Sequence, residues 1–223
     1  MSKKIKQSGP EQSVEKALNK TEKFIEKHKN TLMYAVIAVI VISAIIFAYQ
    51  HLYRKPLIQE ALAQTFIAEQ HFRADSFALA LNGDGNALGF KQIIEEYGSI
   101  ASKSVYLYAG ICELHLENFD KALSYLKKYK SADPIMMARA LCNIGDACTG
   151  LTKYNDAYNY YMKAANYTDN ILAAGYLLKA ALIQEELGNK DEAVKIYEVI
   201  KDKYPQSFEG FESDKYIARL KHQ

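Results

Sequence analysis

The residues best suited to metal chemistry lie in the segment 82–86, whose sequence is NGDGN. Its amide and carboxylate side chains are spaced like the oxygen ligands of a calcium-binding loop. Such a loop also needs a glycine at its sixth position and a bidentate glutamate at its twelfth. Those two positions hold Ala87 and Ile93. The segment therefore predicts a turn between helices and no calcium site.

Two shorter patterns combine histidine with a second metal-binding side chain. His71 and Asp75 are four residues apart, and Cys112 and His115 have the C-x-x-H spacing of half a zinc site. Neither pattern has the further ligands that a zinc site requires, because the five histidines form no cluster. We expect His71 and Asp75 to form a surface pair, and we expect no metal site and no cofactor.

The three cysteines, Cys112, Cys142 and Cys148, are expected to pack as small side chains in helices. An odd number at these spacings indicates no disulfide framework, and one bridge among them in an oxidising compartment is the alternative. The chain contains no glycine-rich phosphate-binding motif and no nucleophile in a strand-to-helix turn. The sequence therefore predicts a protein that is not an enzyme.

Composition limits the class of protein. The chain has 223 residues, of which 49% are hydrophobic and 24% are charged, and its formal net charge is +2. This near balance excludes a strongly basic nucleic-acid-binding protein. The charges are unevenly distributed, since residues 1–30 carry eight lysines and four acids, and residues 31–53 carry no charged side chain. Residues 54–223 carry the remaining 20 basic and 22 acidic side chains, so the chain divides into three parts.

The uncharged segment 31–53 is predicted to be a transmembrane helix. At about 1.5 Å per residue, a helix over this segment is about 34 Å long, which matches the ~30 Å hydrocarbon core of a bilayer. A buried helix of a soluble protein would have a polar face, and a cleaved secretory signal would have a shorter apolar stretch with a small-residue cleavage site. A lipoprotein signal would need a cysteine soon afterwards, but the first is Cys112. We therefore expect an uncleaved anchor.

The basic flank of this segment predicts its orientation. Five lysines between residues 16 and 29 precede the span, whereas only Arg54 and Lys55 follow it closely. Because lysine-rich flanks stay in the cytoplasm, residues 1–30 are expected to form a cytoplasmic lead and residues 54–223 to lie across the membrane. Apolar positions at helical spacing over 13–28 leave two alternatives: a helix on the anionic inner leaflet, or a solvated lead-in.

The chain after residue 102 repeats itself. The segments 119–122 (FDKA) and 154–157 (YNDA) are 35 residues apart, as are Gly110 and Gly145, and Ala193 follows Ala157 by 36 residues. This period and these residue types resemble the tetratricopeptide repeat, a helix pair of about 34 residues. The matching positions are Tyr106, Gly110, Phe119, Ala122, Leu126 and Pro134, then Leu141, Ile144, Gly145, Tyr154, Ala157, Tyr161 and Ala164, then Leu177, Gly188, Ala193, Tyr197 and Pro205.

Contacts between paired helices explain this pattern. Small residues on both helices allow a close approach, and larger residues beside them fill the groove. Asp120, Asn155 and Asp191 are expected to open the second helix of each pair. Pro134 and Pro205 are expected to stop the second helix of their units.

The whole chain is therefore predicted to be all-α, a transmembrane helix followed by an α-solenoid of tetratricopeptide-like helix pairs. We expect a divergent leading helix pair over 54–102, three repeats over 103–205 and a capping helix over 206–223. In the cap, Tyr216, Ile217 and Leu220 are expected to face inward. An irregular helical bundle with coincidental spacing is the alternative.

The resemblance also implies a binding surface. In tetratricopeptide domains the first helices of the pairs line a concave groove. The corresponding positions here are Tyr108, Ile111, Leu114, His115, Arg139, Cys142, Asn143, Asp146, Leu178, Lys179, Leu182 and Glu185. Some of these domains clamp a chaperone's C-terminal carboxylate, but only Asn143, and loosely Lys179, match that clamp. The mixed groove better suits an apolar or amphipathic peptide.

The layout of nearly the whole chain resembles the YfgM-type ancillary subunit of the bacterial SecYEG translocon. That resemblance implies a single-pass protein of the bacterial inner membrane whose repeat domain lies in the periplasm. It implies a non-enzymatic, protein-binding scaffold or chaperone-like module that assists exported chains. The implied partners are translocon subunits, periplasmic chaperones or exported polypeptides, with no nucleic acid and no small-molecule substrate. A scaffold in cell-envelope assembly or cell division is the alternative.

Overall fold

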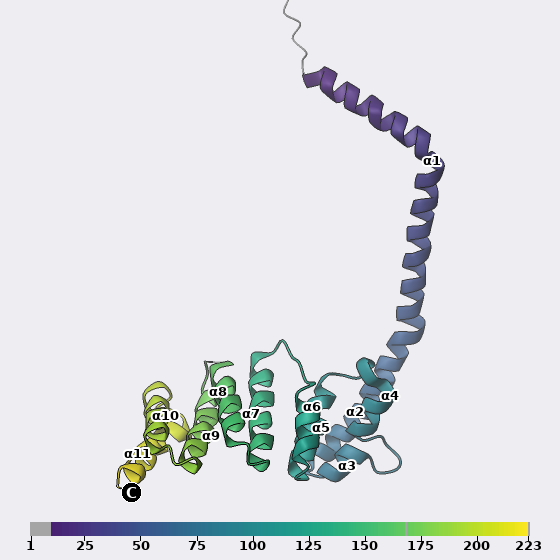
Figure 1. Ribbon diagram of the computed structural model, residues 1–223. Helices are drawn as coiled ribbons and strands as arrows, with labels where there is room; N and C mark the ends of the chain where they lie inside the picture. The colour runs from purple at the N-terminus through teal and green to yellow at the C-terminus, as the bar shows by residue number, and fades with distance from the viewer. Residues whose placement is uncertain (1–9, 168, 223) are drawn as a thin grey trace, which may run out of the picture. The chain divides into compact units, whose positions relative to one another are not determined.

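All regular structure in the described part of the chain is helical, which confirms the all-α prediction. The computed structural model describes residues 10–167 and 169–222, and for residues 10–21, 23–25 and 99 it describes the backbone alone. The chain divides into two units after Pro56. The helices, labelled in Figure 1, are α1 (Pro10–Ala48), a π-helix (Tyr49–Arg54), α2 (Lys55–Arg73), α3 (Phe77–Asn82), α4 (Phe90–Tyr97), a 3-10 helix (Gly98–Ile100), α5 (Ser104–His115), α6 (Phe119–Leu126), α7 (Pro134–Gly150), α8 (Tyr154–Tyr167), α9 (Leu172–Glu186), α10 (Lys190–Lys203) and α11 (Phe208–Lys221).

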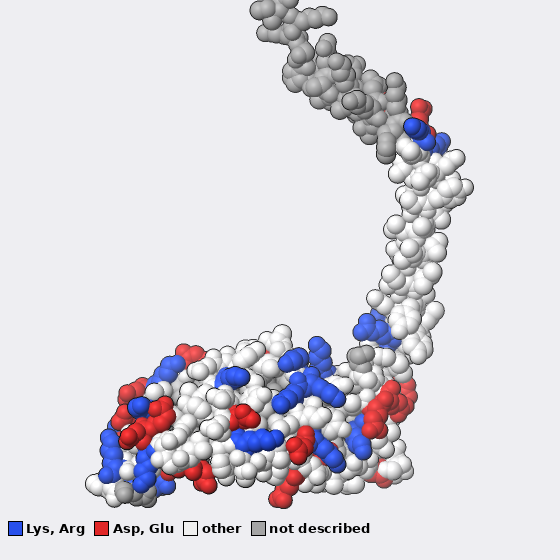
Figure 2. All heavy atoms as spheres, viewed as in Figure 1, with Lys and Arg blue, Asp and Glu red and all other residues white. Residues whose placement is uncertain are grey.

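The first unit contains an apolar helical stretch with fully solvent-facing side chains. The helical segment Glu26–Arg73 includes an 18-residue window of mean hydropathy 2.7 that has no buried residue, so it is long and apolar enough to cross a membrane. Tyr34, Val39 and Phe47 are 63–66% exposed, and Figure 2 shows the stretch without charged side chains. The hydroxyl of Ser43 donates to the Val39 carbonyl at 2.7 Å, which satisfies it within the helix as hydrocarbon surroundings require.

The amphipathic pattern expected within residues 13–28 lies outside the side chains that the structure describes. The residues concerned are Val14, Ala17, Leu18, Thr21, Phe24 and Ile25.

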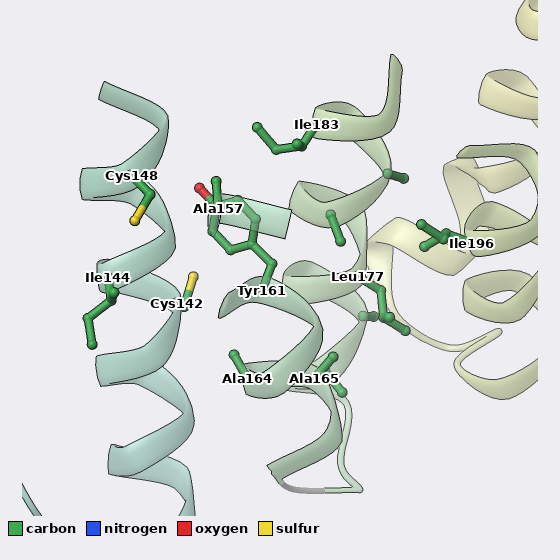
Figure 3. Close-up of a cluster of buried hydrophobic side chains, with 14 of the residues drawn as sticks. Cys142, Ile144, Cys148, Ala157, Tyr161, Ala164, Ala165, Leu177, Ile183 and Ile196 are labelled. Carbon is green, nitrogen blue, oxygen red and sulfur yellow. The ribbon is translucent and has the colours of Figure 1, made fainter. Parts of the chain in front are cut away.

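In the second unit the helices stack in antiparallel pairs. α5 packs against α6, α7 against α8 and α9 against α10, while α11 packs against α10 (Figure 1). Three helices, α2, α3 and α4, precede these pairs where the sequence predicts two. One cluster of buried apolar side chains extends from α2 to α5, and a second extends from α5 to α11. Figure 3 shows Cys142, Cys148 and Tyr161 within the second cluster.

Glycines set the distance between the helices of two pairs. A Cβ atom built on Gly145 would lie 2.5 Å from the Tyr161 ring, and one built on Gly110 would lie 2.5 Å from the Leu126 side chain. Both contacts are closer than packed side chains allow. Each glycine is therefore required where a large side chain of the second helix crosses the first helix.

The turns within the three pairs share one backbone conformation. Glu117, Thr152 and Gly188 have φ values of 60°, 56° and 76°. In each turn the next N–H donates to a carbonyl five residues back, which ends the first helix as in a Schellman motif. These hydrogen bonds join Asn118 to Glu113, Lys153 to Cys148, and Asn189 to Gln184.

One expectation about helix ends is wrong. Pro134 does not stop α6, which ends at Leu126; it is the first residue of α7. Proline suits that position because its missing N–H would have no partner within the helix. The carboxylate of Asp133 caps the same end by accepting from the N–H groups of Ile135 and Met136, at 2.8 and 3.2 Å.

The second helices also begin one residue earlier than the sequence pattern places them. Asp120, Asn155 and Asp191 lie second in α6, α8 and α10, so they stand in the first turn. The residues before α6 and α10, Asn118 and Asn189, make no side-chain cap. The acids Asp120 and Asp191 therefore act on the helix dipole and do not cap the helix.

Replacing Thr152 by glycine is expected to raise the free energy of unfolding by about 0.5–1 kcal/mol, because a β-branched residue at φ 56° is strained and glycine is not. The reverse change, Gly188→Thr, places the same strain in the third turn. It is expected to lower the free energy of unfolding by a similar amount. Urea unfolding of the full chain in detergent, followed by circular dichroism, measures both. A loss of stability in Thr152→Gly would contradict this account.

Candidate protein-binding surface

A hollow on the repeat unit lies between α7, α9 and the start of α11. Its volume is about 610 Å³, and we call it the α7–α9–α11 hollow. Its lining residues are Arg139, Cys142 and Asn143 from α7, Ile171, Leu172, Gly175, Tyr176, Leu178 and Lys179 from α9 and the residue before it, and Gln206, Ser207, Phe208 and Glu209 from the start of α11.

Local backbone chemistry fixes the wall that α11 provides. The hydroxyl of Ser207 accepts from the Gly210 N–H at 2.9 Å, which caps the helix, and donates to the Tyr204 carbonyl at 2.8 Å. Gly210 packs so tightly on the Tyr204 carbonyl that no Cβ would fit. Phe208 is therefore held at a rigid helix start, although its own side chain is 75% exposed.

Exposed apolar side chains form one side of the hollow. Ile171 is 56% exposed and Leu172 is 43% exposed, and both lie at the start of α9. Together with Phe208 they present apolar surface to solvent that no described part of the chain covers. Exposed apolar side chains that line a common hollow are typical of a site of protein interaction.

Two unpartnered donors lie on the α7 side. Arg139 is exposed and makes no hydrogen bond or ion pair within the described residues. One helical turn later, the side-chain Nδ2 of Asn143 is buried and has no hydrogen-bond partner. A buried donor without an acceptor destabilises the folded protein.

Lys179 and Asp146, by contrast, already bind each other. Their side chains are 2.6 Å apart, and Asp146 also accepts from the Tyr161 hydroxyl at 2.8 Å. Burial acts to lower the pKa of Lys179, but the neighbouring Cys142 and Asp146 raise it above its ordinary value. Asp146 supplies this attraction near neutral pH, because the Cys142 thiol is then uncharged. The lysine is therefore a neutralised cation at the wall of the hollow.

The carboxylate of Glu185, like that of Asp146, is already bonded to other side chains of the repeat unit. Its Oε1 accepts from the Tyr197 hydroxyl at 2.6 Å. Both of its oxygens also accept from Nη2 of Arg219, Oε1 at 2.8 Å and Oε2 at 2.7 Å. These bonds join α9 to α10 and to α11. Burial, and then the bond to Glu185, raises the pKa of Tyr197, so the hydroxyl stays protonated. Leu182, one turn earlier on α9, is exposed and lies outside the residues that line the hollow.

The groove positions in the first pair contact the leading helices. Tyr108 stacks on Phe90 with ring centroids 5.4 Å apart, and His115 stacks on Phe77 at 3.8 Å. Ile111 and Leu114 are half-buried and pack against the second apolar cluster.

Five of the predicted groove residues lie together in the hollow: Arg139, Cys142, Asn143, Leu178 and Lys179. Sequence reasoning missed the contributions of Ile171, Leu172 and Phe208. The sequence did contain one indication of the role of Phe208. An aromatic residue directly after the capping Ser207 of a terminal helix faces solvent, and an exposed aromatic side chain indicates a contact residue.

The segments singled out for metal chemistry have structural partners. The carboxylate of Asp84 accepts from the N–H groups of Asn86 and Ala87, at 2.9 and 2.7 Å, and these bonds lower its pKa. The Nε2 of His71 lies 3.7 Å from the Asp84 carboxylate, so its acidic neighbour is Asp84 and not Asp75. Among the described residues, no three metal-binding side chains form a group.

Comparison with known proteins supports the repeat assignment. Residues 138–170 and 176–207 each match a family model described as a tetratricopeptide repeat. Two crystal structures of MamA are similar to the chain, each at 18% identity. The first has a TM-score of 0.50 and covers 70% of this chain and 93% of its own. The second has a TM-score of 0.52 and covers 73% of this chain and 90% of its own. A third MamA structure, MSR-1 C2, is 15% identical, with a TM-score of 0.50 and coverage of 73% and 95%. At these identities the likeness shows the fold alone. No curated protein sequence matches the chain.

The thiols are expected to be unreactive in the folded protein. Burial, followed by the charges of Glu113 and Asp146, raises the pKa of Cys112 and of Cys142 to about 12, and burial also raises the pKa of Cys148. At pH 8 Ellman's reagent should therefore react only slowly with the native chain and should detect all three free thiols in guanidinium. A thiol that reacts within minutes in the native state would contradict this expectation, and a missing thiol after denaturation would indicate a disulfide.

Proposed function

We propose that the chain is a membrane-anchored, non-enzymatic scaffold or chaperone-like module that binds proteins through the α7–α9–α11 hollow. The observation that carries this proposal is the hollow itself, where exposed apolar side chains and unpartnered donors meet on a solenoid of tetratricopeptide type. Solenoids of this kind present extended binding surfaces. The chain has repeats of a type that binds proteins, and they follow one helix that is long and apolar enough to span a membrane.

The proposed location is a bacterial inner membrane, with residues 31–53 in the bilayer, the N-terminus in the cytoplasm and the repeat unit in the periplasm. The lysines before the span support this orientation, since only Arg54 and Lys55 follow it closely. The proposed task is to assist the Sec translocon and the chains that it exports. Support for this task comes from the layout of the chain, a short basic lead, one anchor and a repeat domain.

A protease added to intact spheroplasts tests the orientation. We expect it to digest residues 54–223 and to leave the N-terminal lead protected behind the membrane. An epitope tag at each end of the chain, followed by immunoblotting, reports which part survives, and detergent lysis provides the control in which both are digested. Protection of the C-terminal tag in intact spheroplasts would contradict the proposed compartment.

Photo-crosslinking in cells tests the task. We place p-benzoylphenylalanine at position 208, where an exposed phenylalanine already stands, and as a control at Val199, which is 46% exposed on α10 and outside the hollow. We expect position 208, and not position 199, to label a translocon subunit, a periplasmic chaperone or an exported chain. Labelling of envelope-assembly or division proteins alone would reject the translocon role. Equal labelling from both positions would reject the hollow as the binding surface.

A further inference from the structure

We propose that the α7–α9–α11 hollow binds an internal polypeptide segment in which an acidic side chain stands beside a large apolar one. This inference rests on the proposed function, because it names the class of partner that the same surface selects. It goes beyond an apolar or amphipathic peptide in general by assigning each half of the ligand to one wall of the hollow.

The apolar half of the ligand is assigned to Phe208, Ile171 and Leu172. A capping helix normally turns a polar face to solvent, since its task is to cover the last repeat. α11 does cover the repeat with Ile217 and Leu220, which are buried, but it leaves Phe208 three-quarters exposed. The side chain therefore contributes little to the cap and stands free to contact a ligand.

The acidic half is assigned to the α7 wall, because the one charged side chain there without a partner is the cation Arg139. Arg139 has no acceptor among the described residues, and the buried Nδ2 of Asn143 has none either. The second cation of the hollow, Lys179, is already neutralised by Asp146 at 2.6 Å. An acidic side chain of the ligand that reaches the exposed Arg139 would give this cation its partner.

One acid of the chain, Glu209, lies on the opposite wall. It lines the hollow at the start of α11, and a Cβ atom built on Gly175 would lie 3.2 Å from its Oε1. With Arg139 on one side and Glu209 on the other, the unpaired charges of the hollow are separated. The acidic side chain of a ligand is therefore favoured near α7, beside Arg139, and disfavoured near α11, beside Glu209.

The ligand is an internal segment, because the hollow does not close at its end. A second hollow of about 400 Å³ adjoins it and shares Ile171, Gln206 and Ser207. A chain that leaves the first hollow past these residues continues along the surface, so nothing restricts binding to a chain terminus.

Fluorescence anisotropy with the full chain in lipid nanodiscs tests this inference. The probe is an acetylated and amidated twelve-residue peptide with Leu-Glu-Phe at its centre and Gly and Ser elsewhere, and the matched probes replace the central Glu by Gln or Lys. We expect the Glu peptide to bind about tenfold more tightly than either, since a hydrogen bond to a charged group is worth about that factor or more. A Gln peptide with a free C-terminal carboxylate should bind no better than its amide.

Three variants assign the contacts. Arg139→Gln is expected to weaken the Glu peptide about tenfold and to leave the Gln peptide unchanged. Phe208→Ser is expected to weaken both peptides by a similar factor, because it removes the apolar contact alone. Lys190→Gln removes an exposed cation outside the hollow and should change neither affinity, which controls for net charge.

The outcomes separate this inference from the proposed function. Equal binding of all three peptides, weakened by Phe208→Ser, would overturn the acidic preference and leave the binding surface standing. Tighter binding of the Lys peptide, or of the free carboxylate, would overturn the assignment to Arg139 or to an internal segment. Failure of every peptide to bind would overturn both proposals, and a dimer that Phe208→Ser dissociates would assign the surface to a second copy of the chain.

Discussion

The contact on which the repeat unit depends is the close crossing of the two helices in each pair. At α7 and α8 the Tyr161 ring occupies the space where a side chain on Gly145 would stand, so the two backbones approach closely. The same crossing places the Tyr161 hydroxyl at 2.8 Å from Asp146, which in turn binds Lys179 at the wall of the hollow. Helix spacing and the chemistry of the groove are thus fixed by one interaction.

This coupling explains why several groove residues serve the fold. Asp146 and Glu185 each accept a hydrogen bond from a tyrosine of the second helix, and each also holds a cation. In each case the cation neutralises the charge of the carboxylate, so neither residue offers a net charge to a ligand. The charged side chain on α7 that remains without a partner is Arg139.

The sequence was sufficient to predict the helical class, the long apolar helix and the repeat period, because each depends on residue types along the chain. It could not place Pro134, since the same proline suits the residue after one helix or the first residue of the next. The stacking of His115 on Phe77 joins segments outside the repeat period, so no periodicity could reveal it. The contribution of α11 to the hollow was missed because the pattern identified its buried face alone.

The way in which α11 begins determines how selective such a surface can be. A ligand that meets a mobile side chain loses part of its binding energy to the ordering of that side chain. Here the Ser207 cap and the tight packing of Gly210 on the Tyr204 carbonyl fix the backbone before a ligand arrives. Phe208 has only two side-chain torsions to order, so its apolar surface is presented at low entropic expense. A terminal helix can therefore complete the core with one face and supply a pre-organised contact with its first residue.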